Sequence, residues 1–188
     1  MLVIDSDGTV SIQFDPWRMQ EIQKQTETWI NHLKANPRKL KRHIWRGQLN
    51  ESDPHLFDKI TGRCQRGFMG ERAVAAYVRA PYEWRLLESE RDETDVDGIQ
   101  VRTVDDFTKR LITHEYDRPA PYVLAVADWD TATVVLRGWL HLRHCNVREH
   151  WWATSRAPAF FTPATELHPM RTLREHYKNR KRRLSNGV

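Results

Sequence analysis

The sequence lacks the features that mark several specialised classes of protein. It has no apolar run long enough to cross a membrane as a helix, so we expect no membrane partner. Its two cysteines, Cys64 and Cys145, lie far apart and do not form the framework of a small disulfide-rich protein. The acidic N-terminal residues differ from a signal peptide, and no Gly-rich phosphate-binding loop is present. These absences favour a protein of the reducing cytoplasm.

The composition indicates a folded domain. With 188 residues, the chain is long enough for one domain with a buried core. Hydrophobic residues make up 39% of the chain and charged residues 29%, but the eight tryptophans favour a packed core over disorder.

Basic residues are concentrated in two patches. Between Arg171 and Val188 there are seven Lys or Arg residues and one acid, so the other 170 residues carry a net charge of −1. A second basic patch spans residues 38–46. Such clusters suit a phosphate backbone, although a solvated terminus is the alternative for the tail. The residues expected to bind nucleic acid are Arg38, Lys39, Lys41, Arg42, Arg46, Arg171, Arg174, Lys178, Arg180, Lys181, Arg182 and Arg183.

Hydrophobic periodicity and turn residues predict a mixed α/β, α+β-like fold. Asp15 followed by Pro16 starts a helix that we expect to end near Asn36. Aromatic and proline residues are frequent over 151–169, where we expect irregular packing on the sheet. The other predicted elements are strands over 2–5, 9–14, 82–87, 99–104, 110–114, 122–126 and 133–140, and helices over 56–60, 68–78 and 170–183.

Four polar side chains form a candidate site for a divalent metal ion. Asp95 lies in an acidic turn, and Gln100 and Arg102 are two residues apart, so they share one face of the strand that follows. Glu71 lies in the first turn of a predicted helix. Carboxylate, amide and backbone oxygens, the last at Val101, are ligands that Mg²⁺ accepts, and Arg102 would orient a phosphate. A plain β-turn at Asp95 and a solvated strand face are the alternatives.

The order of these motifs along the chain is itself informative. The motifs are Gly70-Glu71-Arg-Ala, Asp95-x-x-Gly98-x-Gln100-Val-Arg102-Thr103, Tyr122-Val-Leu and Leu136-Arg-Gly-Trp139. Together they resemble the PD-(D/E)XK nuclease superfamily, and most of all its small phage and prophage members. The resemblance covers roughly residues 67–172.

This resemblance implies a restriction-endonuclease-like core: a helix, a mixed sheet of about four to five strands and a flanking helix. It divides a single compact chain into an N-terminal helical extension over 1–66, a core over 67–170 and a basic helix over 171–188. Asp95, Gln100 and Glu71 would hold Mg²⁺ or Mn²⁺, and these three with Arg102 would be the catalytic residues. A phage-encoded protein acting in the host cytoplasm is also implied.

Two residues depart from the superfamily pattern. Gln100 stands where an acid is usual, so the site carries one negative charge fewer. Arg102 stands at the lysine position and stays protonated, so it cannot act as a general base. Asp97 could replace the missing carboxylate, and Lys109 could supply an amine.

The sequence therefore predicts a metal-dependent nuclease that hydrolyses DNA phosphodiester bonds. Single-stranded DNA and RNA stay open as substrates, and a homo-oligomer is compatible with the chain. The second hypothesis is an inactive nuclease-fold protein that binds nucleic acid or another protein. The third is an accessory phage protein whose basic tail docks an acidic partner.

Two further clusters have an ordinary and a functional interpretation. His141, His144 and Cys145 with His150 could bind zinc, but the spacing lacks a second cysteine pair and favours ordinary polar and core roles. The aromatic pairs at 151–152 and 160–161 could stack on unpaired bases, whereas packing over a sheet edge is the simpler role.

Overall fold

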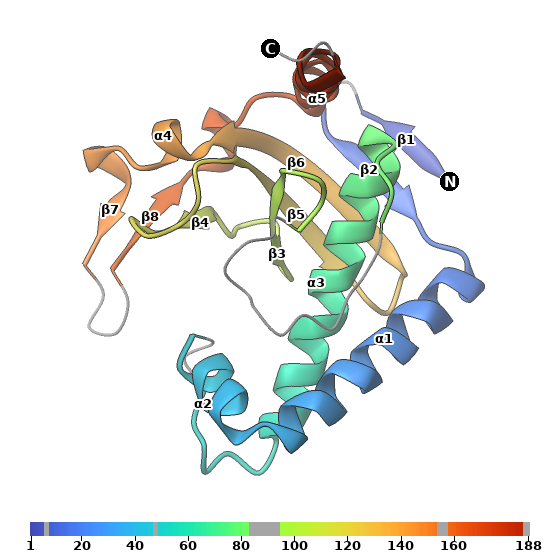
Figure 1. Cartoon of the computed structure of the whole chain (residues 1–188), viewed down its shortest axis with the longest axis vertical. Helices are drawn as coiled ribbons and strands as arrows, with labels where there is room; N and C mark the ends of the chain where they lie inside the picture. The colour runs from blue at the N-terminus through green and yellow to red at the C-terminus, as the bar shows by residue number, and fades with distance from the viewer. Residues whose placement is uncertain (6–7, 47–48, 83–94, 154–157, 186–188) are drawn as a thin grey trace.

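A computed structural model describes residues 1–5, 8–46, 49–82, 95–153 and 158–185 (Figure 1). It confirms the mixed α/β fold. The helices are α1 (Pro16–Ala35), α2 (Pro37–Arg46), α3 (Leu56–Val78), α4 (Leu142–Cys145) and α5 (Met170–Ser185), with short 3₁₀ turns at Arg148–His150 and Ala164–Glu166. The strands are β1 (Leu2–Ile4), β2 (Val10–Gln13), β3 (Gln100–Val104), β4 (Leu111–Thr113), β5 (Pro121–Asp128), β6 (Thr133–His141), β7 (Trp151–Trp152) and β8 (Ala159–Thr162).

The main sheet has five strands in the order β1-β2-β6-β5-β3. Among the described strands, β3 pairs only with β5, in parallel, with Gln100 beside Tyr122. The strands predicted over 122–126 and 133–140 are present as β5 and β6, which pair antiparallel as a hairpin. Gln100 and Arg102 therefore lie on the last strand of this sheet. Backbone groups on its outer edge can meet side chains or ligands.

Helix α1 begins as the sequence predicted. The Asp15 side chain accepts a 2.8 Å hydrogen bond from the backbone nitrogen of Arg18, and Pro16 follows the cap. Ile22, Ile30 and Leu33 form its buried face against α3. Among the described residues, no helix is long and apolar enough to span a membrane.

Helix α3 is continuous, so the prediction of separate helices over 56–60 and 68–78 was wrong. Ile60, Cys64 and Phe68 continue one buried face past Gly62 and Gly67. Each glycine costs a helix only about 1 kcal/mol relative to alanine, so burial of this face outweighs the interruption. The basic residues 38–46 also lie in a helix, α2.

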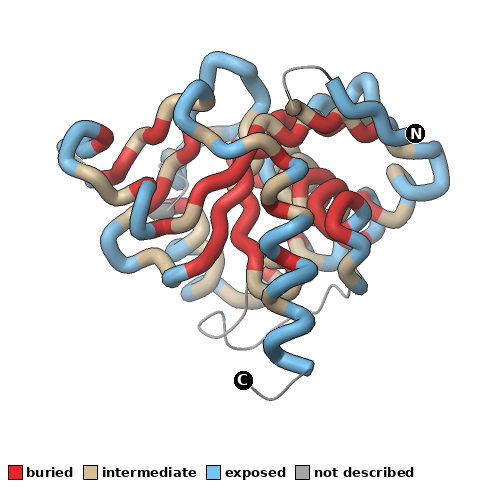
Figure 2. The backbone as a smooth tube through the Cα atoms, turned by 90° about the horizontal axis from the view of Figure 1, so that it is seen from above, coloured by how far each residue is buried: buried red, intermediate tan, exposed pale blue. Residues whose placement is uncertain are grey.

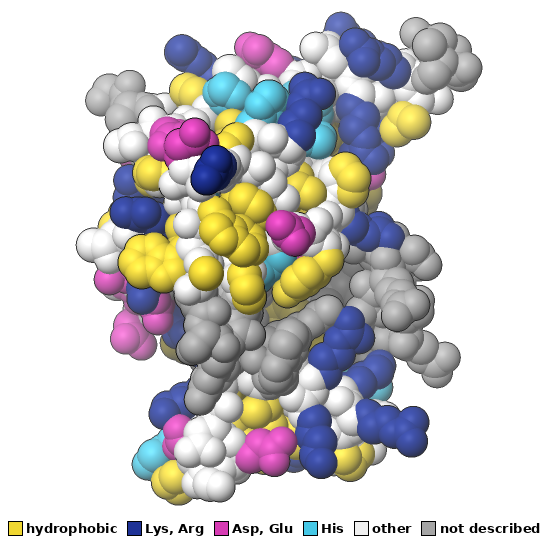
Figure 3. All heavy atoms as spheres, turned by 90° about the vertical axis from the view of Figure 1, so that its left-hand side faces the viewer, with side chains coloured by type: hydrophobic (Ala, Val, Ile, Leu, Met, Phe, Trp, Pro, Cys, Tyr) yellow, Lys and Arg dark blue, Asp and Glu magenta, His cyan; other side chains and the backbone are white. Residues whose placement is uncertain are grey.

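The prediction of irregular packing over residues 151–169 was wrong. This stretch supplies two strands, β7 and β8, of a second sheet in the order β4-β8-β7. The pairing of β8 with β4 joins Leu111 to Thr162, residues far apart in the sequence. Trp151 and Trp152 on β7 are 40% and 61% exposed. Figure 3 shows hydrophobic side chains gathered on the face of the molecule that carries β7 and β8.

The buried interior lies on both faces of the main sheet (Figure 2). Strands β1 and β2 extend this sheet through β6, and the expected boundary after residue 66 falls inside α3. Met170, Leu173 and Tyr177 bury one face of α5 in the core. The expected strand over 82–87 lies outside the described residues from position 83 onward. Figure 1 shows α2 and α5 at opposite ends of the long axis.

Candidate functional site

Asp95 lies beside the outer edge of β3, the edge that does not pair with β5. A tight turn, in which Val96 bridges to Ile99, carries the chain back so that a carboxylate oxygen of Asp95 accepts a 2.6 Å hydrogen bond from the Val101 nitrogen. The N–H and C=O of one residue in a strand point to the same side, so the Val101 carbonyl also faces this edge. A carboxylate and a backbone carbonyl thus meet at the start of β3.

Glu71 approaches the same place from α3. The helix can pack closely on β3 because residue 70 is glycine: a Cβ there would lie 2.1 Å from the Thr103 hydroxyl oxygen. The Tyr82 hydroxyl donates a 2.9 Å hydrogen bond to Glu71 and receives one of 3.1 Å from Gln25. The Glu71 carboxylate is therefore oriented by a chain of polar groups.

The two carboxylates affect each other. Burial first, and then the charge of Asp95, raise the pKa of Glu71 to about 8. Burial also raises the pKa of Asp95, against the lowering effect of its Val101 hydrogen bond and of Arg102. Two acids held close together and away from water are stabilised by a proton or a bound cation.

Gln100 and Arg102 share one face of β3, as strand alternation predicts. Val101 and Thr103 point to α3, so Gln100 and Arg102 point to the opposite face of the sheet. Gln100 is only 8% exposed, and its amide makes no side-chain hydrogen bond to another described residue. Gln100 therefore begins β3 directly after the turn at Val96–Ile99, with its amide on the sheet face opposite α3.

Arg102 is already engaged within the protein. Its guanidinium forms a 3.0 Å ion pair with Asp117, donates a 3.3 Å hydrogen bond to the Ile112 carbonyl and lies 5.0 Å over the Tyr122 ring. Burial opposes its charge, but Asp117 and Asp95 together raise the pKa of Arg102. Two of its five N–H donors are used in these hydrogen bonds, which leaves others for a phosphate.

Asp117 and Tyr82 are parts of this site that sequence reasoning missed. The sequence around Asp117 marked only the end of a strand, and Tyr82 was part of an expected strand. Both reach the site through folding, which brings them to residues distant in sequence, Arg102 and Glu71 respectively. No local pattern signals such partners.

The expected substitutes for the departing residues do not join the site. Asp97 points to α5 instead, where its carboxylate accepts a 2.6 Å hydrogen bond from the Tyr177 hydroxyl and pairs at 2.5 Å with Lys181. Lys109 is exposed in the turn after β3, before β4 begins, so it is not on the next strand as expected. Neither residue replaces the acid or the lysine of the motif.

The candidate ligands suit Mg²⁺ or Mn²⁺ in kind, because the Glu71 and Asp95 carboxylates, the Val101 carbonyl and the Gln100 amide would all offer oxygen atoms. As a set they are poor in charge. Among the described residues, no group of three or more His, Cys, Asp or Glu side chains is placed to hold a metal ion. The site therefore fits a weakly held, partly hydrated cation better than a closed structural metal.

The expected nucleic-acid-binding residues fall at two separate places. In α2, Arg38, Lys41 and Arg42 are exposed and Lys39 is half-buried, while the side chain of Arg46 lies outside the described residues. In α5, Arg174 lies over the Tyr77 ring and Arg180 donates to the Asp97 carbonyl. The exposed cations of α5 are Arg171, Lys178, Lys181, Arg182 and Arg183, of which Lys181 pairs with Asp97. Part of the tail is thus anchored to the turn that carries Asp95.

Within the His/Cys cluster, His150 and Cys145 have structural roles. His150 is buried, and its ring contacts the Cys145 carbonyl at 3.0 Å and the Glu166 carboxylate at 2.9 Å. Cys145 is buried too, and burial raises its pKa to about 11, so its thiol is protonated at neutral pH. These contacts favour the ordinary roles over zinc.

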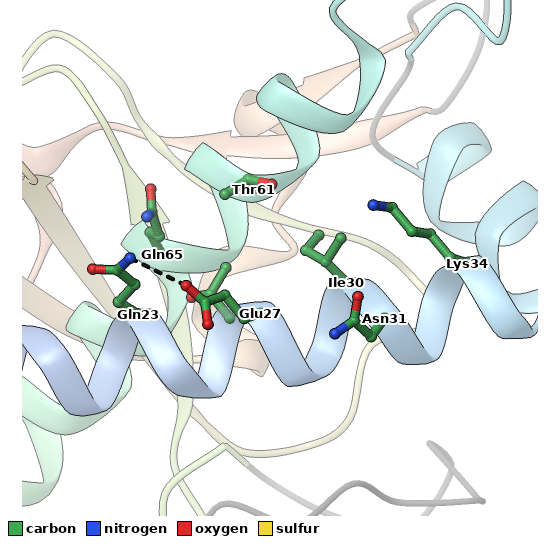
Figure 4. Close-up of a pocket in the computed structure, with 8 residues that line it drawn as sticks. Gln23, Glu27, Ile30, Asn31, Lys34, Thr61 and Gln65 are labelled. Atoms are coloured by element: carbon green, nitrogen blue, oxygen red, sulfur yellow. Dashed lines mark hydrogen bonds between the residues drawn. The ribbon is translucent and has the colours of Figure 1, made fainter.

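A hollow of about 370 Å³ lies between α1 and α3, away from this site (Figure 4). Gln23 donates a 3.1 Å hydrogen bond to Glu27 at its wall, and Lys34 supplies the opposite charge at its far end. Its lining combines neutral polar side chains, one acid, one base and an apolar residue, so it does not favour one class of ligand.

Comparisons of this chain with models of protein families, with curated proteins and with solved structures found no significant match. The function is therefore inferred from the residues and the geometry described above.

Proposed function

We propose that this protein is a metal-dependent nuclease that hydrolyses DNA phosphodiester bonds. The observation that carries the proposal is a pair of buried, electrostatically coupled carboxylates, Glu71 and Asp95, of which Asp95 accepts a hydrogen bond from the Val101 nitrogen at the outer edge of β3. Arg102 lies next to Asp95, as a group that binds a scissile phosphate should. These residues come from α3, a turn and β3, so folding brings them together.

In this proposal Asp95, Glu71 and Gln100 hold Mg²⁺ or Mn²⁺, which neutralises charge on the phosphate and activates water when bound. Asp95 is kept in place by the Val101 N–H, and Glu71 by Tyr82. Arg102 binds a phosphate oxygen through donors that Asp117 and Ile112 leave available. Because Arg102 stays protonated, it stabilises charge and does not accept the proton of water.

The test is direct. Purified protein is incubated with Mn²⁺ and end-labelled single-stranded or double-stranded DNA, with RNA in parallel, and products are resolved by length. Metal-dependent cleavage that stops on chelation supports the proposal. Absence of cleavage of all substrates over a broad range of pH and metal concentration contradicts it.

One observation favours an alternative function. Arg102 is held by Asp117 and Ile112, as it would be in a nuclease fold that has become a binding module. Such a protein would bind DNA with an affinity that falls steeply with salt and would not cleave it. The cleavage assay and a salt titration of binding distinguish the two.

We expect Gln100→Glu to strengthen Mn²⁺ binding by about tenfold or more, because it restores a negative charge beside Asp95. The same change should lower the thermal stability of the metal-free protein, since position 100 is 8% exposed and a third acid would be confined there. Isothermal titration calorimetry measures the first effect and thermal unfolding the second. Gln20→Glu, at an exposed position of α1, is the control and should change neither appreciably. Unchanged or weaker metal binding in Gln100→Glu would remove this residue from the site.

The basic tail is better tested by charge removal than by deleting residues 171–188, because deletion would remove the core residues Leu173 and Tyr177 with their helix. Replacing Lys178, Arg182 and Arg183 with Gln should weaken DNA binding and reduce the slope of log K against log salt by about 0.9 for each phosphate that is no longer neutralised. Fluorescence anisotropy over a range of salt concentrations gives this slope. The same number of charges removed at Lys109, Arg143 and Arg148 is the control. Equal effects in both variants would show that the tail acts only through net charge.

A further inference from the structure

A pocket of about 510 Å³ lies on the side of the Asp97-Gly98 turn that faces α5. Four segments form it: the turn itself, residues 118–121 before and at the start of β5, the end of β6 and the middle of α5. The side chains of Arg118, His141, His176 and Arg180 line its walls. The pocket is separate from the hollow between α1 and α3.

The lining carries one sign of charge. Two arginines contribute this charge, two histidines lie beside them, and no acid is present among the described lining residues. Burial, followed by Arg143, His176 and His144, lowers the pKa of His141. Burial, followed by Arg180 and Arg183, lowers the pKa of His176. Every neighbour whose charge lowers the pKa of these two histidines is an arginine or another histidine, so the local electrostatic field favours an anion.

The cationic side chains are held in position by the fold. Arg180 donates a 2.6 Å hydrogen bond to the Asp97 carbonyl, and its guanidinium occupies the space beside Gly98, where a Cβ would lie 1.7 Å from Nη1. The His176 ring packs on Trp139 with 5.3 Å between ring centroids. The buried Nδ1 of His141 has no hydrogen-bond partner among the described residues. A positioned guanidinium and an imidazole that lacks a structural partner are typical of a binding site.

We propose that this pocket binds a phosphate group. Guanidinium groups bind phosphate oxygens through paired N–H donors, and imidazole groups can supply further donors and take up a proton as the anion enters. The volume is sufficient for a phosphate together with part of an attached nucleoside. Two sources share this chemistry: the terminal phosphate of a nucleic-acid strand, and free phosphate or a mononucleotide. The binding does not depend on cleavage at Asp95.

The experiment is calorimetric titration of the full-length protein with inorganic phosphate at constant ionic strength. Arg180→Ala and His176→Gln should each weaken binding by about tenfold or more, the usual effect of losing a hydrogen bond to a charged group. Arg148→Ala removes the same charge from an exposed position outside the pocket and outside the two basic patches, and it should change affinity by less than about twofold. Thermal unfolding confirms that each variant is folded, and His176→Gln provides the test if Arg180→Ala disturbs the turn.

Two further titrations identify the source. Tighter binding of a 5′- or 3′-phosphorylated oligonucleotide than of its hydroxyl-ended counterpart, lost in Arg180→Ala, supports a strand terminus. Equal binding of these oligonucleotides, together with competition between a mononucleotide and inorganic phosphate, supports a free ligand. The proposal is overturned if phosphate does not bind at millimolar concentration, or if Arg148→Ala weakens binding as much as Arg180→Ala.

Discussion

Asp95→Asn is expected to reduce metal-dependent DNA cleavage by about a thousandfold or more. The change removes one of two carboxylates from the site, and the loss of a metal ion's charge stabilisation is worth several kcal/mol in the transition state. The asparagine oxygen can still accept the hydrogen bond from the Val101 nitrogen, so the turn and the edge of β3 should keep their structure. The rate is measured with labelled DNA and excess Mn²⁺.

The matched control is Asp106→Asn, which alters an exposed acid beyond the other end of β3. It should cleave DNA within about twofold of the unmodified protein, since surface substitutions away from a site have small effects. Thermal unfolding of both variants shows whether either loses its fold. Full activity in a folded Asp95→Asn variant would exclude Asp95 as a metal ligand.

The second large effect concerns the pH dependence of stability in the absence of metal. Burial and the charge of Asp95 raise the pKa of Glu71 from an ordinary 4.5 to about 8, so the folded state holds this proton more tightly than the unfolded state. The contribution of Glu71 to stability is then complete below about pH 4.5 and is lost as pH rises towards 8. The loss is at most about 1.4 kcal/mol for each pH unit.

Glu71→Gln should flatten this decline, because the amide has no proton to lose. Chemical denaturation of the metal-free protein at several pH values from about 5 to 8 measures the effect as a change in the free energy of unfolding. Mn²⁺ should restore stability near pH 8 in the unmodified protein and much less in Asp95→Asn. Glu175→Gln, at an exposed position of α5, is the control for loss of a carboxylate. An unchanged slope in Glu71→Gln would show that Glu71 does not carry this proton.

The two predictions together separate the active nuclease from the inactive binding module. An active enzyme shows both the metal-dependent stabilisation at high pH and the loss of cleavage in Asp95→Asn. A protein whose stability depends on pH in this way, but which Mn²⁺ does not stabilise and which does not cleave DNA, has kept Glu71 and Asp95 but does not bind a metal ion there. In that case the ion pair of Arg102 with Asp117 serves to hold the fold together rather than to position a scissile phosphate.

Much of the fold was predictable because its signals are local. Asp15 with Pro16 marks the start of α1 through a cap that involves neighbouring residues only. The hairpin of β5 and β6 follows from two β-forming runs around a short polar turn. Helix α5 follows from the spacing of Met170, Leu173 and Tyr177. The second sheet was not predictable, because β8 pairs with β4 across a long stretch of chain and neither strand alone carries a pairing signal.

By itself, the sequence determined which residues share a strand face and which lie in a turn: Gln100 with Arg102, and Asp95 before them. The periodicity of a strand settles this without any other part of the chain. Only the tertiary structure decided what each side chain meets. It pairs Arg102 with Asp117 and turns Asp97 towards α5. It also brings Glu71 to Asp95, because Gly70 lets α3 approach Thr103 closely. The physical reason is that burial, charge coupling and hydrogen bonding depend on distance in space, which local pattern does not contain.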